Sequence, residues 1–280
     1  MPFIFRILIP ILFFQSTIFG IGTQFLSIPQ TAMELIIGVN PVIINIANKP
    51  VLSASYGNWL ADMKMSSFSY NRHAFGGSAG FDFRYINLSD LELRNDRPTD
   101  NPLAVFGATA IALDGNYIRQ TRGGLLSTKL RYISMQLFDE TATGFAMDIG
   151  LQRKVNDKLN MGISLHNLGS MSELYKEKPK LPVRLIIGSS YNFKVNNIDN
   201  SLIIAVEESS IVDGIILRVG DIAKWNKLQF LIGTQFTKNV ASVSGGIGIK
   251  LGAYDIKYGI QFGSQSLGIP QMLDVSVVLP

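Results

Sequence analysis

Hydrophobic and polar residues alternate along much of this chain. In residues 143–152, Phe145, Met147 and Ile149 share one face, and Asp148 lies on the other. Successive side chains of a β-strand point to opposite faces, so this alternation predicts a strand with two chemically different sides. The pattern alone leaves open whether the apolar face meets a protein core or lipid.

A second alternating run follows at residues 158–168, where Leu159 and His166 fall on opposite faces. Asn156 and Asp157, which lie between the two runs, are residue types that favour tight turns. The two runs are therefore predicted to form a hairpin, and similar runs recur to the end of the chain.

About fourteen segments of this kind can be counted. They are residues 51–56, 61–71, 77–88, 108–120, 125–136, 143–152, 158–168, 182–194, 200–208, 213–219, 227–236, 241–251, 253–262 and 272–279. An even number of strands of roughly ten residues fits a closed transmembrane barrel, because lipid tolerates no unpaired strand edge.

The connections between these segments test the barrel independently. If neighbouring strands are antiparallel, one end of the barrel receives the short linkers 72–76, 121–124, 153–157, 195–199, 220–226 and 252. The other end receives the three longest linkers, which are 89–107, 169–181 and 263–271. Outer-membrane barrels have this asymmetry, with short periplasmic turns and longer extracellular loops.

We therefore predict an all-β fold: a transmembrane antiparallel β-barrel of about 14 strands with a short N-terminal plug segment, in a bacterial outer membrane. Its apolar faces would contact membrane lipid, and its polar faces would line the lumen. The alternative is a large soluble β-barrel or sandwich in which the same residues have reversed roles, with the apolar faces inside.

The composition agrees with a membrane protein. Hydrophobic residues make up 47% of the chain and charged residues only 16%, yet beyond the N-terminus no segment is long enough for a transmembrane helix, which needs about 18 apolar residues. The absence of Cys excludes disulfides and thiol-ligated metals. The net charge of +4 comes without a basic cluster interleaved with aromatics, so no nucleic-acid partner is expected.

Three regions are expected along the chain. Residues 1–20 read as a secretory signal peptide, the alternative being an uncleaved membrane anchor. Residues 21–50 form an N-terminal plug or lid segment, and residues 51–280 form the barrel. Within the second region, Phe25–Ile46 is too apolar to be left in water, so it either folds into the lumen as a short plug or covers the periplasmic mouth.

Charged residues on the polar faces are the candidate lumen-lining residues. They are Asp82, Arg84, Lys129, Arg131, Asp148, His166, Arg184, Asp255 and Lys257. Both signs are represented, which predicts a charge-balanced network that braces a wide barrel. The sequence shows no metal-ligand spacing, and no cofactor is expected.

Catalysis is not expected, because few residues could perform it. The chain has two histidines, His73 in a predicted turn and His166 on a polar face. Ser164 shares the face of His166, but residues two apart along a strand are separated by about 7 Å, which is too far for a direct hydrogen bond.

Several short segments of the sequence resemble the PorV/PorQ family of bacterial outer-membrane proteins. They are YGNWLADMK at 56–64, TGFAMDIGL at 143–151, HNLG at 166–169 and KLPVRLIIGSSY at 180–191, and the likeness covers about half of the chain. The resemblance implies a fourteen-stranded barrel like that of the long-chain fatty-acid transporter FadL. It also implies a link to type IX secretion, in which some members hold or pass on exported cargo proteins.

Two functions are therefore expected as alternatives. The first is protein secretion or surface attachment, with cargo proteins and other secretion components as partners, bound at loops 89–101 and 170–180. The second is FadL-like transport of a small hydrophobic molecule, such as a fatty-acid-like ligand, past the N-terminal segment. Fold alone does not choose between them.

Overall fold

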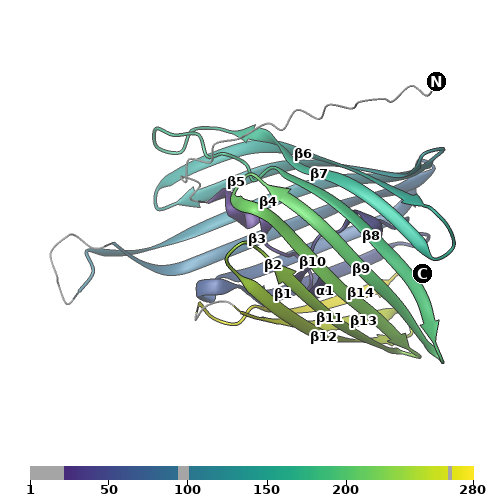
Figure 1. Ribbon diagram of the computed structural model, residues 1–280. Helices are drawn as coiled ribbons and strands as arrows, with labels where there is room; N and C mark the ends of the chain where they lie inside the picture. Colours follow the sequence, from purple (N-terminus) through teal and green to yellow (C-terminus); the bar gives the residue numbers. More distant parts are fainter. Residues whose placement is uncertain (1–21, 94–100, 264–266) are drawn as a thin grey trace, which may run out of the picture.

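The computed structural model describes residues 22–93, 101–263 and 267–280, so the expected signal peptide at 1–20 lies outside the described residues. Within these ranges the chain forms fourteen antiparallel strands that close into a barrel, each paired with its sequence neighbours and β1 paired with β14 (Figure 1). The predicted fold class is confirmed.

The strands follow one another directly along the chain. Their bounds are β1 (Val51–Asn58), β2 (Lys64–Ala74), β3 (Gly77–Leu93), β4 (Ala104–Thr121), β5 (Gly124–Leu137), β6 (Glu140–Lys154), β7 (Leu159–Met171), β8 (Arg184–Val195), β9 (Ile198–Ser209), β10 (Val212–Trp225), β11 (Leu228–Phe236), β12 (Ala241–Leu251), β13 (Tyr254–Phe262) and β14 (Gln271–Val278). Short helices precede β1 and β2: η1 (Thr23–Ser27), α1 (Ala32–Ile37), η2 (Pro41–Ile43) and η3 (Leu60–Asp62).

The faces of the strands are oriented as the alternation predicts. On β6, Phe145 and Ile149 point away from the barrel, whereas Asp148 and Ala146 are buried inside it. The outer surface carries large apolar side chains on the other strands too, such as Ile187 and Phe230. A soluble protein rarely exposes so extensive an apolar surface, so the alternative of a soluble barrel or sandwich is wrong.

The two ends of the barrel differ as expected. The connections at residues 75–76, 122–123, 155–158, 196–197, 226–227 and 252–253 have two to four residues and share one end, here called the turn end. The three longest connections, residues 94–103, 172–183 and 263–270, share the opposite end, here called the loop end. Asn196 and Asn226 have φ values of 53° and 54°, a conformation that tight hairpin turns require.

Several strand boundaries differ from the sequence prediction. Strand β3 continues to Leu93 and β4 begins at Ala104, so the expected linker 89–107 is shorter. Residues 220–226 were expected to form a linker, but β10 continues to Trp225 and the turn comes only after it. Gly220 lies on the inner face of β10 because Ile37 approaches there, and a Cβ would come within 2.6 Å of the Ile37 side chain. The expected strand 61–71 begins instead at Lys64, after η3.

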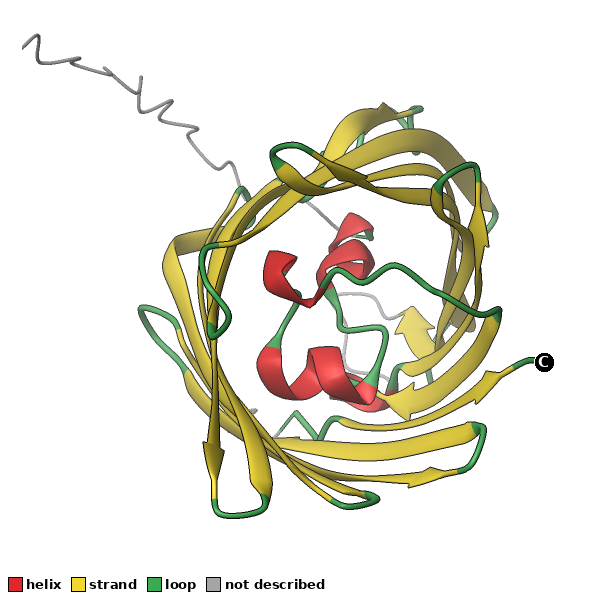
Figure 2. Cartoon of the chain, turned by 90° about the vertical axis from the view of Figure 1, so that its right-hand side faces the viewer, coloured by secondary structure: helices red, strands yellow, loops and turns green. Residues whose placement is uncertain are grey.

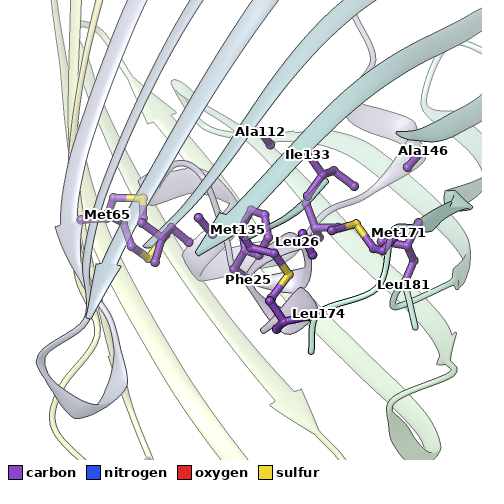
Figure 3. Packing of buried hydrophobic residues seen from close by; sticks show 14 of the residues in the cluster. Phe25, Leu26, Met65, Ala112, Ile133, Met135, Ala146, Met171, Leu174 and Leu181 are labelled. Atoms are coloured by element: carbon purple, nitrogen blue, oxygen red, sulfur yellow. The ribbon is translucent and has the colours of Figure 1, made fainter. Parts of the chain in front are cut away.

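The N-terminal segment, residues 22–50, lies inside the barrel, where Figure 2 shows the helices enclosed by the ring of strands. Near the loop end, Phe25 and Leu26 of η1 pack against Met135 and Met171 of the wall (Figure 3). Leu174, from the loop after β7, is buried in the same cluster. No helix among the described residues is long and apolar enough to cross a membrane.

A second apolar cluster fixes the rest of this segment. Ile36 and Ile37 of α1 and Val42 of η2 pack against inward-facing residues of β9, β10 and β11, which are Ile203, Ile222 and Leu231. The sequence suggested a lumen that is polar throughout. This expectation is wrong in two places, where apolar residues of the wall pack against the N-terminal segment.

Candidate functional site in the barrel lumen

Glycines on the inner faces of four strands make the seat of α1. They are Gly220 on β10, Gly233 on β11, Gly246 on β12 and Gly259 on β13. A Cβ at Gly233 would overlap the carbonyl oxygen of Ile36, so the helix reaches the wall only because this strand position has no side chain.

Polar contacts hold the N-terminal end of α1. The carboxylate of Asp274 on β14 accepts hydrogen bonds from the backbone N–H of Ala32 at 2.8 and 2.9 Å, and the Thr31 hydroxyl accepts one from the N–H of Glu34 at 3.1 Å. The helix ends at Gly38, whose φ of 74° favours glycine. A Cβ at Gly38 would overlap the side chain of Arg218.

A network of charged side chains covers the wall from β3 to β7. Lys129 lies 2.8 Å from Asp82 and 3.3 Å from Asp114. Arg131 donates to both oxygens of Asp114 at 2.8 and 3.0 Å and to Asp148 at 3.2 Å. Asp114 was not among the sequence candidates, although it lies directly opposite Arg131 in the β4–β5 register.

A second group of ion pairs lies on β8, β9 and β10. Arg184 donates to both oxygens of Glu207 at 2.6 and 2.8 Å, and Arg218 donates to the same carboxylate. Arg218 also donates from Nε to Gln235 at 2.9 Å. The sequence analysis missed Glu207 and Arg218. The pattern that could have identified them as lumen-facing is that each lies on the strand face opposite large apolar residues.

The other candidates lie apart from these groups. Arg84 donates to the carbonyl oxygens of Phe25 and Ile28 at 2.6 and 3.3 Å, so it ties the N-terminal segment to the wall. Lys257 and Asp255 pair with each other at 2.6 Å on β13. The nine candidates thus face the interior, but they make separate groups rather than one network.

Ser164 and His166 are much closer than the sequence analysis assumed. The Oγ of Ser164 lies 2.8 Å from Nε2 of His166, and Nδ1 of His166 lies 3.4 Å from Oδ2 of Asp148. The imidazole ring spans the gap between the two strand positions. A β-bulge lies beside it, where His166 and Asn167 of β7 together oppose the single residue Asp148 of β6. Asn167 has a φ of 60°, and its N–H donates to Asp148 at 2.7 Å.

Two cavities remain beside the N-terminal segment. The first, here called the wide cavity, has a volume of about 420 Å³ and reaches Asn71 and Asn116 near the turn end. The second, here called the loop-side cavity, has a volume of about 260 Å³ and is bordered by Trp59 and Pro270 of the loop-end connections. In the described residues no three His, Asp or Glu side chains are grouped as metal ligands would be.

The two cavities adjoin at four residues, here called the partition. Four residues line both of them: Glu34, Gly38, Val39 and Arg184. Three of these belong to the N-terminal segment and only Arg184 belongs to the wall. The N-terminal segment thus separates the two cavities, and at this point the wall contributes Arg184, which is paired with Glu207.

The wide cavity has two unlike sides. The N-terminal segment contributes apolar side chains, among them Met33, Val39 and Ile43, whereas the wall contributes the charged network and Ser164. Lys129 and Arg131 are paired with acids of the wall, whereas Arg84 donates to backbone carbonyl oxygens of the N-terminal segment, which itself adds the acid Glu34 to the lining. The cavity thus combines apolar side chains with charged groups that are largely paired.

Three solved structures resemble this barrel. The "TodX deltaS2S3 mutant monoaromatic hydrocarbon channel" has a TM-score of 0.56 and 11% identity, covering 89% of this chain and 97% of its own. The "CymD monoaromatic hydrocarbon channel" has a TM-score of 0.56 and 11% identity, covering 92% of both chains. The toluene transporter TodX of Pseudomonas putida has a TM-score of 0.54 and 11% identity, covering 85% of this chain and 90% of its own.

At 11% identity these likenesses establish the fold, which is that of a transmembrane β-barrel of the outer-membrane type. The predicted location in a bacterial outer membrane is confirmed with it. No protein-family model matches the chain, and no curated protein matches its sequence. The resemblance to the PorV/PorQ family therefore stays a prediction.

Proposed function

We propose that the protein is an outer-membrane channel that carries small hydrophobic or amphiphilic molecules through its lumen. The observation that carries the proposal is the pair of cavities that meet at a partition of four residues. The structural neighbours support it, because those proteins are described as hydrocarbon channels and a toluene transporter.

The route would run from the loop-side cavity to the wide cavity and then to the turn end. The wide cavity, at about 420 Å³, falls in the range of 300–1,000 Å³ that is typical of small-molecule sites. Passage between the cavities needs a displacement of Gly38 and Val39, while the glycine-seated helix α1 can remain in place.

The lining indicates which molecules fit. An apolar body would contact Met33, Val39 and Ile43 of the N-terminal segment. Opposite them, Lys129 and Arg131 are held by carboxylates, so a ligand without charge need not strip an unpaired cation of water. A hydrocarbon with at most a small polar group suits this surface, and monoaromatic compounds are the first class to test.

A role in protein secretion rests on the sequence resemblance alone. Of the two loops expected to bind cargo, 170–180 places Leu174 in the apolar cluster beneath the loop end and leaves Tyr175 exposed. The other loop, 89–101, lies partly outside the described residues. Cargo binding stays a prediction, and the cavities favour transport.

Val39 offers the sharpest test because it lines both cavities and makes no side-chain hydrogen bond. Val39→Trp should fill the partition and reduce uptake of radiolabelled toluene to that of cells without the protein. Asn48→Trp is the matched control, since Asn48 belongs to the same segment, is exposed and lines neither cavity. Its uptake should equal that of the wild type.

Both variants must first be shown to fold, by resistance of the barrel to unfolding in cold detergent. Val39→Ala completes the series, because a smaller residue at the partition should keep or raise uptake. Wild-type uptake no faster than background, for toluene and for a long-chain fatty acid alike, would contradict the proposal.

A further inference from the structure

We propose that Ser164, His166 and Asp148 form a hydrolytic site that cleaves small esters entering the wide cavity. All three side chains line this cavity. The inference goes beyond transport, because it assigns a chemical reaction to the wall of the lumen. The proposed site lies within the described residues, and its reaction needs no metal or cofactor.

The three contacts follow the order that nucleophilic catalysis requires. Ser164 Oγ lies 2.8 Å from His166 Nε2, and His166 Nδ1 lies 3.4 Å from the Asp148 carboxylate. The carboxylate favours a proton on Nδ1, which leaves Nε2 free to accept the hydroxyl proton of Ser164. Catalytic hydrogen bonds are often long without substrate, so the second distance is compatible with this role.

Asp148 is itself held in position by two other groups. Its Oδ1 accepts a hydrogen bond from the backbone N–H of Asn167 at 2.7 Å, and its Oδ2 accepts one from Arg131 at 3.2 Å. Arg131 is shared with Asp114, so His166 is the third group that contacts the Asp148 carboxylate. The histidine and the serine continue this chain of contacts towards the cavity.

A bulge in β7 lies at this site. The backbone positions of Ser164 and His166 are about 7 Å apart along the strand, a gap that the imidazole ring spans. At the bulge, His166 and Asn167 together oppose Asp148, and the Asn167 N–H donates to this carboxylate. Bulges that re-aim a side chain are frequent beside active sites.

The cavity also suggests the substrate. The apolar side formed by Met33 and Ile43 suits a short acyl or aryl group, and the volume of about 420 Å³ limits its size. A small uncharged ester has both an apolar body and a carbonyl group.

The reaction would proceed in two balanced steps. Ser164 Oγ forms a bond to the ester carbonyl carbon while its proton passes to His166 Nε2, and the released alcohol takes that proton as the ester bond breaks. Water then attacks the acyl-serine, giving a proton to His166, and the carboxylic acid leaves as Ser164 regains its proton. Water is the only co-reactant, and nothing is oxidised or reduced.

The test uses the full-length protein, purified and folded in detergent micelles, so that transport plays no part. A fluorophosphonate probe should label the wild type, and peptide mapping should place the adduct on Ser164. Hydrolysis of p-nitrophenyl butyrate gives the rate. Ser164→Ala should abolish labelling, and His166→Gln should lower the rate by about 10²–10⁴-fold, the usual contribution of a general base.

Two further variants separate chemistry from folding. Ser201→Ala is the matched control, because Ser201 lines neither cavity and its hydroxyl donates to Oδ1 of Asn192 at 2.7 Å. This variant should keep both labelling and hydrolysis. Asp148 acts as a positioning residue, so Asp148→Asn should lower kcat with little change in KM while the barrel stays folded.

An unlabelled wild type, or an adduct at a serine other than Ser164, would overturn the proposal. So would hydrolysis that survives Ser164→Ala. None of these results would bear on uptake through the partition, so failure of the hydrolytic site and failure of the transport function are distinguishable.

Discussion

The two halves of the lumen wall differ in how they meet the N-terminal segment. On β10 to β13 each strand has an inward-facing glycine, and α1 lies directly on the strands at these positions. On β3 to β8 the inner face carries paired charges, and a cavity of about 420 Å³ separates much of it from the segment. The glycines, which have no side chains, thus let the N-terminal segment pack directly on one half of the wall. On the other half, large polar side chains keep space open.

The difference also has an energetic side. Apolar contact such as that of Ile36 and Ile37 with the wall stabilises roughly in proportion to the area removed from water. Buried ion pairs contribute little net stability, yet breaking one leaves an uncompensated charge and is costly. The charged half is therefore better suited to shaping a cavity than to holding a helix.

The largest loss of stability is expected from removing the central cation of the charged half of the wall. Arg131→Leu would leave Asp114 and Asp148 without their guanidinium partner, and we expect a loss of about 3–5 kcal/mol in the free energy of unfolding. Denaturant unfolding of the barrel in lipid or detergent would measure it.

The matched control for this change is Lys194→Leu, at the exposed pair with Asp199 near the turn end. Exposed pairs of this kind contribute little, so its stability should stay close to that of the wild type. If the two variants lost similar amounts, the wall network would matter no more than a surface ion pair.

A smaller loss is expected on the glycine half. Gly233→Val would place a side chain where the Ile36 backbone lies, and overpacking of this kind typically costs about 1–3 kcal/mol. Limited proteolysis should also cut the displaced N-terminal segment faster than in the wild type.

Gly245→Val tests whether the effect comes from the lumen. Gly245 faces outward on β12, and an added Cβ would meet nothing closer than 3.9 Å. We expect wild-type stability and protease resistance. Equal damage from both substitutions would show that strand glycines matter for the backbone and not for seating α1.

Much of the barrel could be predicted from alternation alone. The strand predicted at 241–251 matches β12 in both bounds, because regular alternation ends at the turn beginning with Gly252. The prediction failed at 220–226, where Gly220 and Asp221 resemble a turn. The glycine is there for the approach of Ile37, which is a long-range contact that local pattern cannot show.

The candidate site was predicted less completely. Alternation placed charged residues such as Arg131 and Arg184 in the lumen, but it could not say which of them pair. The contact between Ser164 and His166 was missed because the spacing of strand positions ignores the reach of the imidazole ring. The contact of the Asn167 N–H with Asp148 depends on a bulge, and an extra residue in one strand leaves no reliable signal in the sequence. One signal went unused: the glycines that seat α1 recur every 13 residues, at positions 220, 233, 246 and 259.

The smallest effect on stability is expected at an acidic residue on the outer surface. This residue lacks the ion pairs that the acids in the lumen have. Asp221 lies between Leu202 and Ile232 in the sheet, and both of these face outward. Its Oδ1 is buried without a hydrogen-bond partner among the described residues. A carboxyl group on the lipid face is unfavourable, though less so than Lys or Arg.

Asp221→Leu should therefore stabilise the barrel, by about 1 kcal/mol or less. Asp213→Leu, at an exposed position near the loop end of the same strand, should change stability less, because water reaches that carboxylate. The pair of variants, unfolded side by side from the same lipid, isolates the cost of an unpaired acid in the apolar band. Destabilisation by Asp221→Leu would mean that this acid has a favourable partner in the membrane, as the lumen acids have theirs within the chain.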